Sequence, residues 1–228
     1  MMRRLTLAVL VLGSAGLIDS EPTWGQSSKS AAQVANLTVM ATTPGGAIVT
    51  PWQPILSASI HTSQQKDLVI SVSLESSLLT RALAKSRNKT QDKSMASAGI
   101  EVQVLVDGAP AYPGVVVYNK RKQELTATFQ GILAGCLTTS LETGSVIIDP
   151  ACVEPEELDL LLDTTSANHF NFILDDVGVG THAIEVQARI DLSASSQTGA
   201  GEAKAIIGKG SVVVEEVRLV KGADVFEP

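Results

Sequence analysis

The sequence predicts an all-β protein: an antiparallel β-sandwich or jelly roll with one short helix and a cleaved N-terminal signal peptide. Two observations point to the sandwich. Apolar and polar residues alternate over several segments, and turn signals separate these segments at intervals of roughly 10 to 20 residues, which fits an antiparallel sandwich and not a βαβ fold. The chain has 228 residues, 44% of them hydrophobic, which is enough for one large core. Because aromatic residues make up only 4%, the core must consist mainly of Val, Ile, Leu and Ala.

The N-terminus has the features of a secretory signal peptide. A short basic segment, Met1 to Arg4, precedes an uncharged apolar run from Leu5 to Ile18. That run is shorter than the ~20 residues that span a membrane. We therefore predict a signal peptide over residues 1–25 with its cleavage site left open, a flexible lead-in over 26–35, and a single β-sandwich domain over 36–228. The predicted localisation is secreted, either extracellular or periplasmic, without a transmembrane span.

Export gives meaning to the two cysteines, Cys136 and Cys152. An oxidising compartment favours a disulfide between them, which would contribute about 3 kcal/mol by the chain-entropy estimate. The enclosed stretch has a turn signal, Thr143-Gly144, between two short apolar runs. A metal site would need further soft ligands nearby, and the sequence shows none.

Strands are predicted in the first half of the domain from period-2 alternation. Asp67 to Glu75 places Leu68, Ile70, Val72 and Leu74 on one face, and Ile100 to Asp107 does the same with Ile100, Val102, Val104 and Val106. After the turn signals Asp107-Gly108 and Tyr112-Pro113-Gly114, shorter runs at 115–118 and 124–130 complete this region.

Two segments depart from the alternation. Pro155 to Asp163 has a proline and acids at its start and Leu158, Leu161 and Leu162 at helical spacing, which predicts a short helix at one end of the sandwich. Ser76 to Ala98 reads as irregular and basic. With Lys120-Arg121-Lys122 at a predicted hairpin tip, it forms either a basic patch for an anionic glycan or acidic partner, or ordinary solvated loops.

The last third predicts a long hairpin. Its arms are Thr181 to Ser195 and Glu202 to Val220, joined by a flexible tip at 196–201. Val212 and Val214 face one way while Val217 and Leu219 need the other, so we expect a β-bulge near Glu215-Glu216. Before the hairpin, Phe170, Phe172 and Leu174 form an inward stripe that ends at Asp175-Asp176.

No established catalytic motif occurs in the chain. H-E-x-x-H, G-x-S-x-G and C-x-x-C are absent, and the glycine-rich stretches near 199–204 and 207–211 fail as nucleotide-binding loops. The histidines, His61, His169 and His182, belong to different predicted strands. His182 begins a strand on its apolar face, and we expect it to bond a turn carbonyl at a hairpin corner; a calcium site at Asp175-Asp176 would need further oxygen ligands. No catalytic residue, metal or cofactor is therefore assigned.

Ligand-binding candidates are few. The net charge of −7 and pI near 5.0 disfavour nucleic acid as a partner. Protein or glycan partners, and a homo-oligomer, remain open. The candidates are the aromatic residues outside the predicted core and the basic run beside them: Trp52, Tyr112, Tyr118, Lys120, Arg121 and Lys122.

The run Gly180 to Arg189, followed by Lys209 to Glu215, is similar to the closing hairpin of secreted or surface β-sandwich proteins. These include jelly-roll domains of the C1q/TNF-like kind and uncharacterised bacterial exported proteins. The resemblance implies a jelly roll that binds partners through trimerisation.

Three functional hypotheses follow. The first is an exported non-enzymatic protein with a binding or structural role at the cell surface, in the periplasm or in the extracellular matrix. The second is a secreted hydrolase with a site built from loops. The third is a self-assembling filament or appendage subunit that uses an edge strand or its N-terminal segment for β-augmentation.

Overall fold

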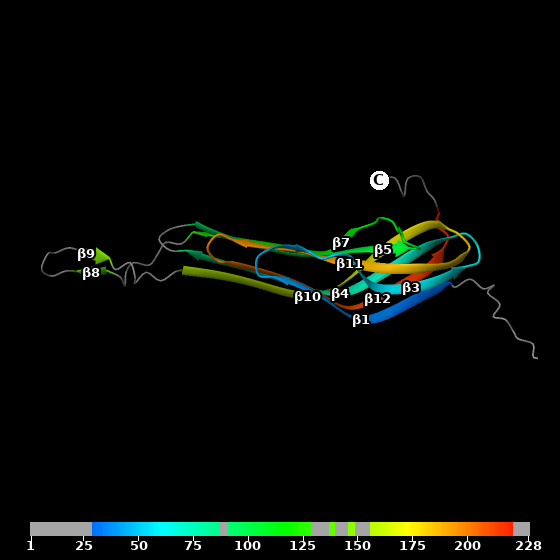
Figure 1. Ribbon diagram of the computed structural model, residues 1–228, viewed down its shortest axis with the longest axis horizontal. Helices are drawn as coiled ribbons and strands as arrows, with labels where there is room; N and C mark the ends of the chain where they lie inside the picture. The colour runs from blue at the N-terminus through cyan, green and yellow to red at the C-terminus, as the bar shows by residue number, and fades with distance from the viewer. Residues whose placement is uncertain (1–28, 87–90, 129–136, 140–145, 149–155, 221–228) are drawn as a thin grey trace, which may run out of the picture.

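The computed structural model describes residues 29–86, 91–128, 137–139, 146–148 and 156–220. Within these ranges every regular element is a β-strand, and the strands pack as two antiparallel layers, which confirms the predicted β-sandwich (Figure 1). The described part of the chain holds no helix with the length and apolarity needed to cross a membrane. The predicted signal peptide and both cysteines lie outside the described residues.

Each layer has four long strands. Sheet A contains, in spatial order, β1 (Ser30–Thr43), β12 (Ala200–Val217), β4 (Lys66–Ser86) and β10 (Glu156–Val177). Sheet B contains β3 (Gln53–Thr62), β11 (Gly180–Ser196), β5 (Gln91–Val106) and β7 (Val116–Thr128). The short strands β2 (Gly46–Val49) and β6 (Ala109–Pro110) also pair with β11 and β5.

A separate two-stranded hairpin lies in the segment between the two cysteines. The two short apolar runs there form β8 (Leu137–Thr139) and β9 (Val146–Ile148), which pair antiparallel with each other. The predicted turn between them, Thr143-Gly144, lies outside the described residues.

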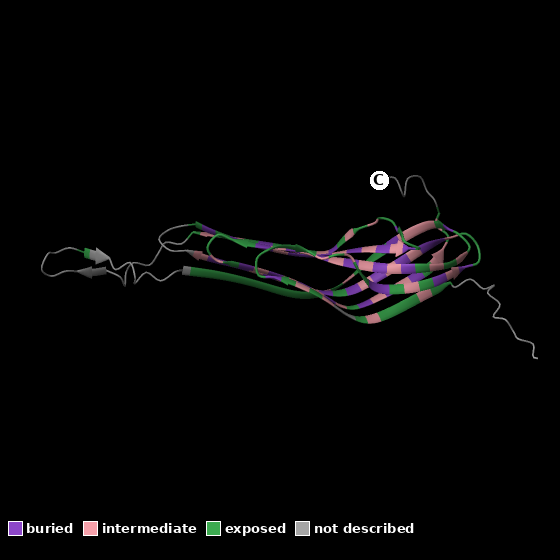
Figure 2. Ribbon diagram, viewed as in Figure 1, coloured by how far each residue is buried: buried purple, intermediate pink, exposed green. Residues whose placement is uncertain are grey.

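The core lies between the sheets, on the faces that the alternation predicts. Leu68, Ile70 and Val72 of β4 are fully buried, as are Ile100 and Val102 of β5. Figure 2 shows this as purple bands that alternate along the strands. Each such branched side chain contributes about 1.5–3 kcal/mol when it leaves water, so the aliphatic core accounts for most of the stabilisation.

Most long strands that follow one another in the chain lie in opposite sheets. β3 and β4, β4 and β5, β10 and β11, and β11 and β12 are each divided between sheets B and A. The predicted C-terminal hairpin is therefore wrong: its arms are β11 and β12, which face each other across the core and pair with other strands. Alternation marks the buried face of a strand but does not identify its hydrogen-bonding neighbour.

The predicted helix at Pro155 to Asp163 is also wrong, because Glu156 begins strand β10. Residues Glu156 to Asp163 pair with Ser86 to Leu79 of β4 in unbroken register. Period 2 fits this segment as well, since Leu158, Leu160 and Leu162 share one face of the strand and Leu161 lies on the other. Pairing along the neighbouring strand overrides the local helix preference.

The described parts of Ser76 to Ala98 are not irregular either. β4 continues to Ser86 and β5 begins at Gln91, with buried Ser76, Thr80, Ala82 and Ala84 continuing the inward stripe. The alternation was not recognised in the sequence because these inward positions carry small or hydroxyl-bearing residues. Likewise, Lys120 to Lys122 lie inside strand β7 and do not form a hairpin tip.

The β-bulge predicted near Glu215-Glu216 is wrong, and β12 has a bulge at another place. Ile207 and Val212 are both fully buried, although residues five apart in a regular strand face opposite ways. The register between β12 and β4 shifts between Ile207 and Gly210, so the extra residue lies there and not near Glu215-Glu216. In addition, β1 starts at Ser30, inside the segment predicted as a flexible lead-in.

Candidate functional site

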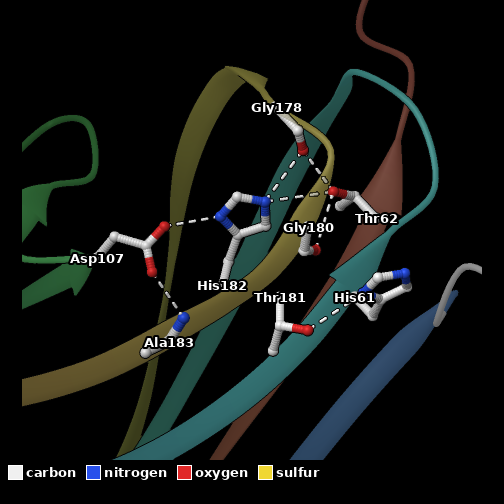
Figure 3. Close-up of polar contacts among 8 residues, drawn as sticks. All are labelled: His61, Thr62, Asp107, Gly178, Gly180, Thr181, His182 and Ala183. Atoms are coloured by element: carbon white, nitrogen blue, oxygen red, sulfur yellow. Dashed lines mark hydrogen bonds and ion pairs between the residues drawn. The ribbon is translucent and has the colours of Figure 1, made fainter. Parts of the chain in front are cut away.

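The corner between β10 and β11 contains Asp175, Asp176 and His182, for which the sequence left a turn or a calcium site open. His182 is the third residue of β11, and its side chain is only 13% exposed. Its Nδ1 lies 2.7 Å from Oδ2 of Asp107, in the turn after β5, and Oδ1 of Asp107 accepts the backbone N–H of Ala183 (Figure 3). The hydrogen bonds from His182 and Ala183 lower the pKa of the Asp107 carboxyl.

The other ring nitrogen of His182 faces the turn before β11. Nε2 lies 3.0 Å from the Gly178 carbonyl, which confirms the expected bond to a turn carbonyl, and 3.2 Å from Oγ1 of Thr62 (Figure 3). The Thr62 hydroxyl is buried at the end of β3 and donates to the same Gly178 carbonyl. An Asp107–His182–Thr62 array therefore exists, but its hydroxyl points into the protein. The array joins three segments of chain and presents no nucleophile to solvent.

Backbone conformation completes this corner. Gly180 has φ +141° and Asp176 has φ +53°, so the chain uses a glycine and an aspartate where left-handed conformations are needed. The N–H of Asp176 donates to Oδ1 of Asp67 at 3.0 Å. Across the described residues, no three His, Cys, Asp or Glu side chains are grouped to hold a metal ion.

A second array lies on the outer face of sheet A. His169 of β10 is directly opposite Ser73 of β4, with 2.9 Å between Nδ1 and Oγ. Nε2 of His169 lies 2.8 Å from Oδ1 of Asn171, which also accepts the hydroxyl of Ser71. If Nε2–H donates to Asn171, Nδ1 accepts the Ser73 proton, which is the arrangement that a general base requires. Sequence analysis could not find this array, because cross-strand register brings its members together.

An open groove of about 270 Å³ borders the Ser73 array. Ser73, Glu75 and Ala167 line it from β4 and β10, and Lys209 and Ser211 line it from β12. Lys209 is the cation in this lining.

The six predicted ligand-binding residues do not form one surface. Trp52 has the guanidinium of Arg189 4.6 Å from its ring centre, on sheet B. The backbone of Tyr112 bridges to Ile173 of β10. Tyr118 is buried, and its hydroxyl accepts the N–H of Leu74 at 2.8 Å.

The basic run is divided between the two faces of β7. Lys120 and Lys122 are exposed, with Nζ 4.0 Å from Asp191 and 3.9 Å from Glu124. Arg121 points between the sheets instead, where Nη1 donates to the carbonyls of Leu78 and Leu162. The run is thus not a single cationic patch.

A third candidate is the N-terminal half of β10, which we call the leucine edge (residues 157–165). β10 is the last strand of sheet A, and every residue of the leucine edge is exposed (Figure 2). Leu158, Leu160, Leu161 and Leu162 are exposed by 46%, 40%, 56% and 42%. Sheet edges in monomers are normally short, charged or covered, so a long edge with consecutive exposed leucines is a candidate docking site.

Among the described strands, only β4 pairs with the backbone of the leucine edge. Farther along β10, the N–H and C=O of Ile173 pair with Tyr112, on the side away from β4. The β10–β4 register is unbroken from Glu156 to Leu174, so all odd-numbered residues of the leucine edge direct their N–H and C=O groups to that same open side. These groups form a template for another strand.

Neighbouring strands hold the leucine edge in place. Gln123 of β7 donates to the carbonyl of Leu160 at 2.7 Å, and Arg121 bonds the carbonyl of Leu162. On the outer face, Arg81 binds Asp159 with three N···O contacts of 2.6–3.1 Å, and Lys85 pairs with Glu157 at 2.6 Å. An edge that is already ordered loses less conformational entropy on binding.

Comparison with known proteins does not assign the chain to a family. No protein-family model and no curated protein matches the chain. Among solved structures, the chain is similar to the structure of the infectious bursal disease virus Gx strain, with 12% sequence identity and a TM-score of 0.24. The match covers 92% of this chain and 43% of that one, so this chain spans less than half of its length. A likeness at this TM-score carries no argument about fold or function.

Proposed function

We propose that this chain is an exported, non-enzymatic β-sandwich of jelly-roll topology that works by binding another protein along the leucine edge. Two four-stranded sheets whose consecutive strands mostly alternate between layers support the jelly roll. The basic and apolar N-terminal segment supports export, and export in turn supports a Cys136–Cys152 disulfide.

The observation that carries the binding role is the leucine edge itself. It combines four exposed leucines with a row of outward N–H and C=O groups on a strand that its neighbours already hold. Addition of a strand would satisfy the backbone groups and remove the leucines from water, at about 25 cal/mol per Å² of apolar surface. A structural role, whether in a closed oligomer or in a filament, follows from such an edge.

Hydrogen exchange tests this proposal. Protein isolated from its own source without denaturant is compared with the purified chain at nanomolar concentration. We expect the amides of Glu157, Asp159 and Leu161 to exchange slowly only in the native material, because a partner strand accepts their N–H groups. Equally fast exchange of these amides in both samples would contradict a role for the leucine edge.

The Ser73–His169–Asn171 array supports a second candidate function, hydrolysis of small acyl esters. In that reaction Oγ of Ser73 would attack the ester carbonyl while Nδ1 of His169 takes its proton, and the protonated ring would return it to the departing alkoxide. Water would then release the acyl group from Ser73. A fluorophosphonate probe tests this: labelling that Ser73→Ala abolishes and Ser77→Ala leaves intact would favour the hydrolase. Ser77 is a matched control, because it lies on the same face of β4 and bonds Thr165 instead of a histidine.

A further inference from the structure

We infer that the partner of the leucine edge is a second copy of this chain, paired antiparallel about a two-fold axis through Leu161. This inference rests on the function proposed above and specifies its partner. It would join two four-stranded sheets A into one continuous eight-stranded sheet.

The sequence of the leucine edge is self-complementary. Asp159-Leu160-Leu161-Leu162-Asp163 reads the same in both directions about Leu161. A two-fold contact places residue i against residue j and j against i, so only a palindromic strand sets like residues opposite one another throughout. Here Leu161 faces its own copy, and Leu160 faces Leu162 of the other chain on the inner side. Cross-strand leucine pairs of this kind exclude water from both chains.

This register places two carboxylates opposite each other, and a neighbouring arginine can neutralise both. Asp159 of one copy lies opposite Asp163 of the other, and like charges in directly opposed positions are unfavourable. Arg81 already donates hydrogen bonds to Asp159 from Nε and Nη2, whereas its Nη1 has no hydrogen bond to any described residue. The guanidinium is therefore placed to neutralise both carboxylates, with Nη1 donating to Asp163 of the second copy.

The next rung of the ladder has no such conflict. Glu157 lies opposite Thr165 of the second copy and already pairs with Lys85. Lys85 and Arg81 are both on the outer face of β4, and their side chains are similarly exposed, at 41% and 43%. The register thus predicts that Arg81 matters for association and that Lys85 does not, although each lies on the same strand and binds one acid of β10.

Sedimentation velocity of the purified chain and its variants tests the inference, with the melting temperature as a check on folding. We expect a species of twice the single-chain mass. Arg81→Gln should raise the dimer dissociation constant at least tenfold, and adding Asp163→Asn to it should restore association. Lys85→Gln should change the constant less than twofold. Because Arg81 is a surface residue, its replacement leaves the core intact.

Each other outcome overturns the two-fold contact. A chain that stays monomeric at high micromolar concentration excludes it, and a trimer favours the assembly implied by the C1q/TNF-like resemblance. Equal loss of association for Arg81→Gln and Lys85→Gln excludes this register. The exchange experiment separates the two proposals. If the leucine edge exchanges slowly in native material but the purified chain is monomeric, the edge binds a different partner. That result would refute the dimer and still support the binding role.

Discussion

Asp92 and Thr198 connect two corners of the sandwich that are more than a hundred residues apart in sequence. Asp92, near the start of β5, is almost fully buried, and its Oδ1 accepts the backbone N–H of Thr198 at 3.1 Å. Its Oδ2 accepts the N–H of Lys85 at 2.7 Å, near the end of β4. One carboxylate therefore satisfies backbone donors from the β4–β5 corner and the β11–β12 corner together.

Replacement of Asp92 by alanine should lower the free energy of unfolding by about 2–3 kcal/mol, because two backbone donors lose a charged acceptor at a buried site. Urea denaturation of the two proteins measures the difference. Asp191→Ala is the matched control: the Asp191 side chain is 42% exposed and its carboxylate lies as far as 4.0 Å from Nζ of Lys120, so its loss should cost no more than about 0.5 kcal/mol. Equal effects of the two substitutions would refute the role of Asp92.

Stability should also fall in acid, with Asp92 responsible for part of the loss. Burial raises the pKa of Asp92, but the hydrogen bonds from Lys85 and Thr198 outweigh it and leave the pKa below its ordinary value. Because the folded pKa lies below the unfolded value of about 3.9, the contribution is complete above that value and is lost as pH falls through the folded pKa. Asp107 has the same sign, through its bonds from His182 and Ala183.

Melting temperatures measured from pH 7 to pH 2 test this dependence. The wild-type curve should drop below pH 4, and Asp92→Asn should drop less, since it has no carboxylate to protonate. Parallel curves for the two proteins would show that Asp92 has no part in the acid transition.

The faces of the strands were predictable from the sequence, whereas their partners were not. The inward positions of β4 and β5 follow from alternation because burial acts on each strand separately. Whether β11 pairs with β12 or faces it across the core depends on contacts far along the chain. The leucines of β10 show the limit of local patterns: Leu158, Leu161 and Leu162 fit a helix, and only pairing with β4 makes them a strand.

The β-bulge of β12 shows a limit of prediction from apolar alternation. The predicted extra residue near Glu215-Glu216 is wrong, because β12 stays in register with β4 from Gly210 to Val217; the parity instead changes between Ile207 and Val212. The break falls at Gly208-Lys209, where a Cβ added at Gly208 would lie 2.7 Å from Oε1 of Glu75. The arrays of His182 and His169 were beyond prediction, because each depends on residues brought together by register.

Tyr118→Phe should destabilise the protein although the ring remains. The hydroxyl is buried between the sheets and accepts the N–H of Leu74, and it also contacts the carbonyl of Asn168. Loss of one such bond costs about 1 kcal/mol. Ser77→Ala, which removes a solvent-exposed bond to Thr165, provides the comparison and should be nearly neutral in the same denaturation experiment.

The two glycines of the β10–β11 corner should respond differently to substitution. Gly180 has φ +141°, which L-residues rarely adopt, while Gly178 has an ordinary φ; a Cβ added at either position meets no atom within 4 Å. Space is therefore equal at the two sites, and only backbone strain differs. Gly180→Val should lower stability by about 1–3 kcal/mol. Gly178→Val, the matched substitution, should cost less.

Asp176→Asn tests whether a carboxylate of the same corner binds calcium. Asn tolerates the φ of +53° found there as well as Asp does, and the backbone N–H that donates to Asp67 is retained. We expect calcium to leave the melting temperatures of both the wild type and Asp176→Asn unchanged. A calcium-dependent rise in the wild-type melting temperature that Asp176→Asn removes would instead make this corner a metal site and not a turn between two sheets.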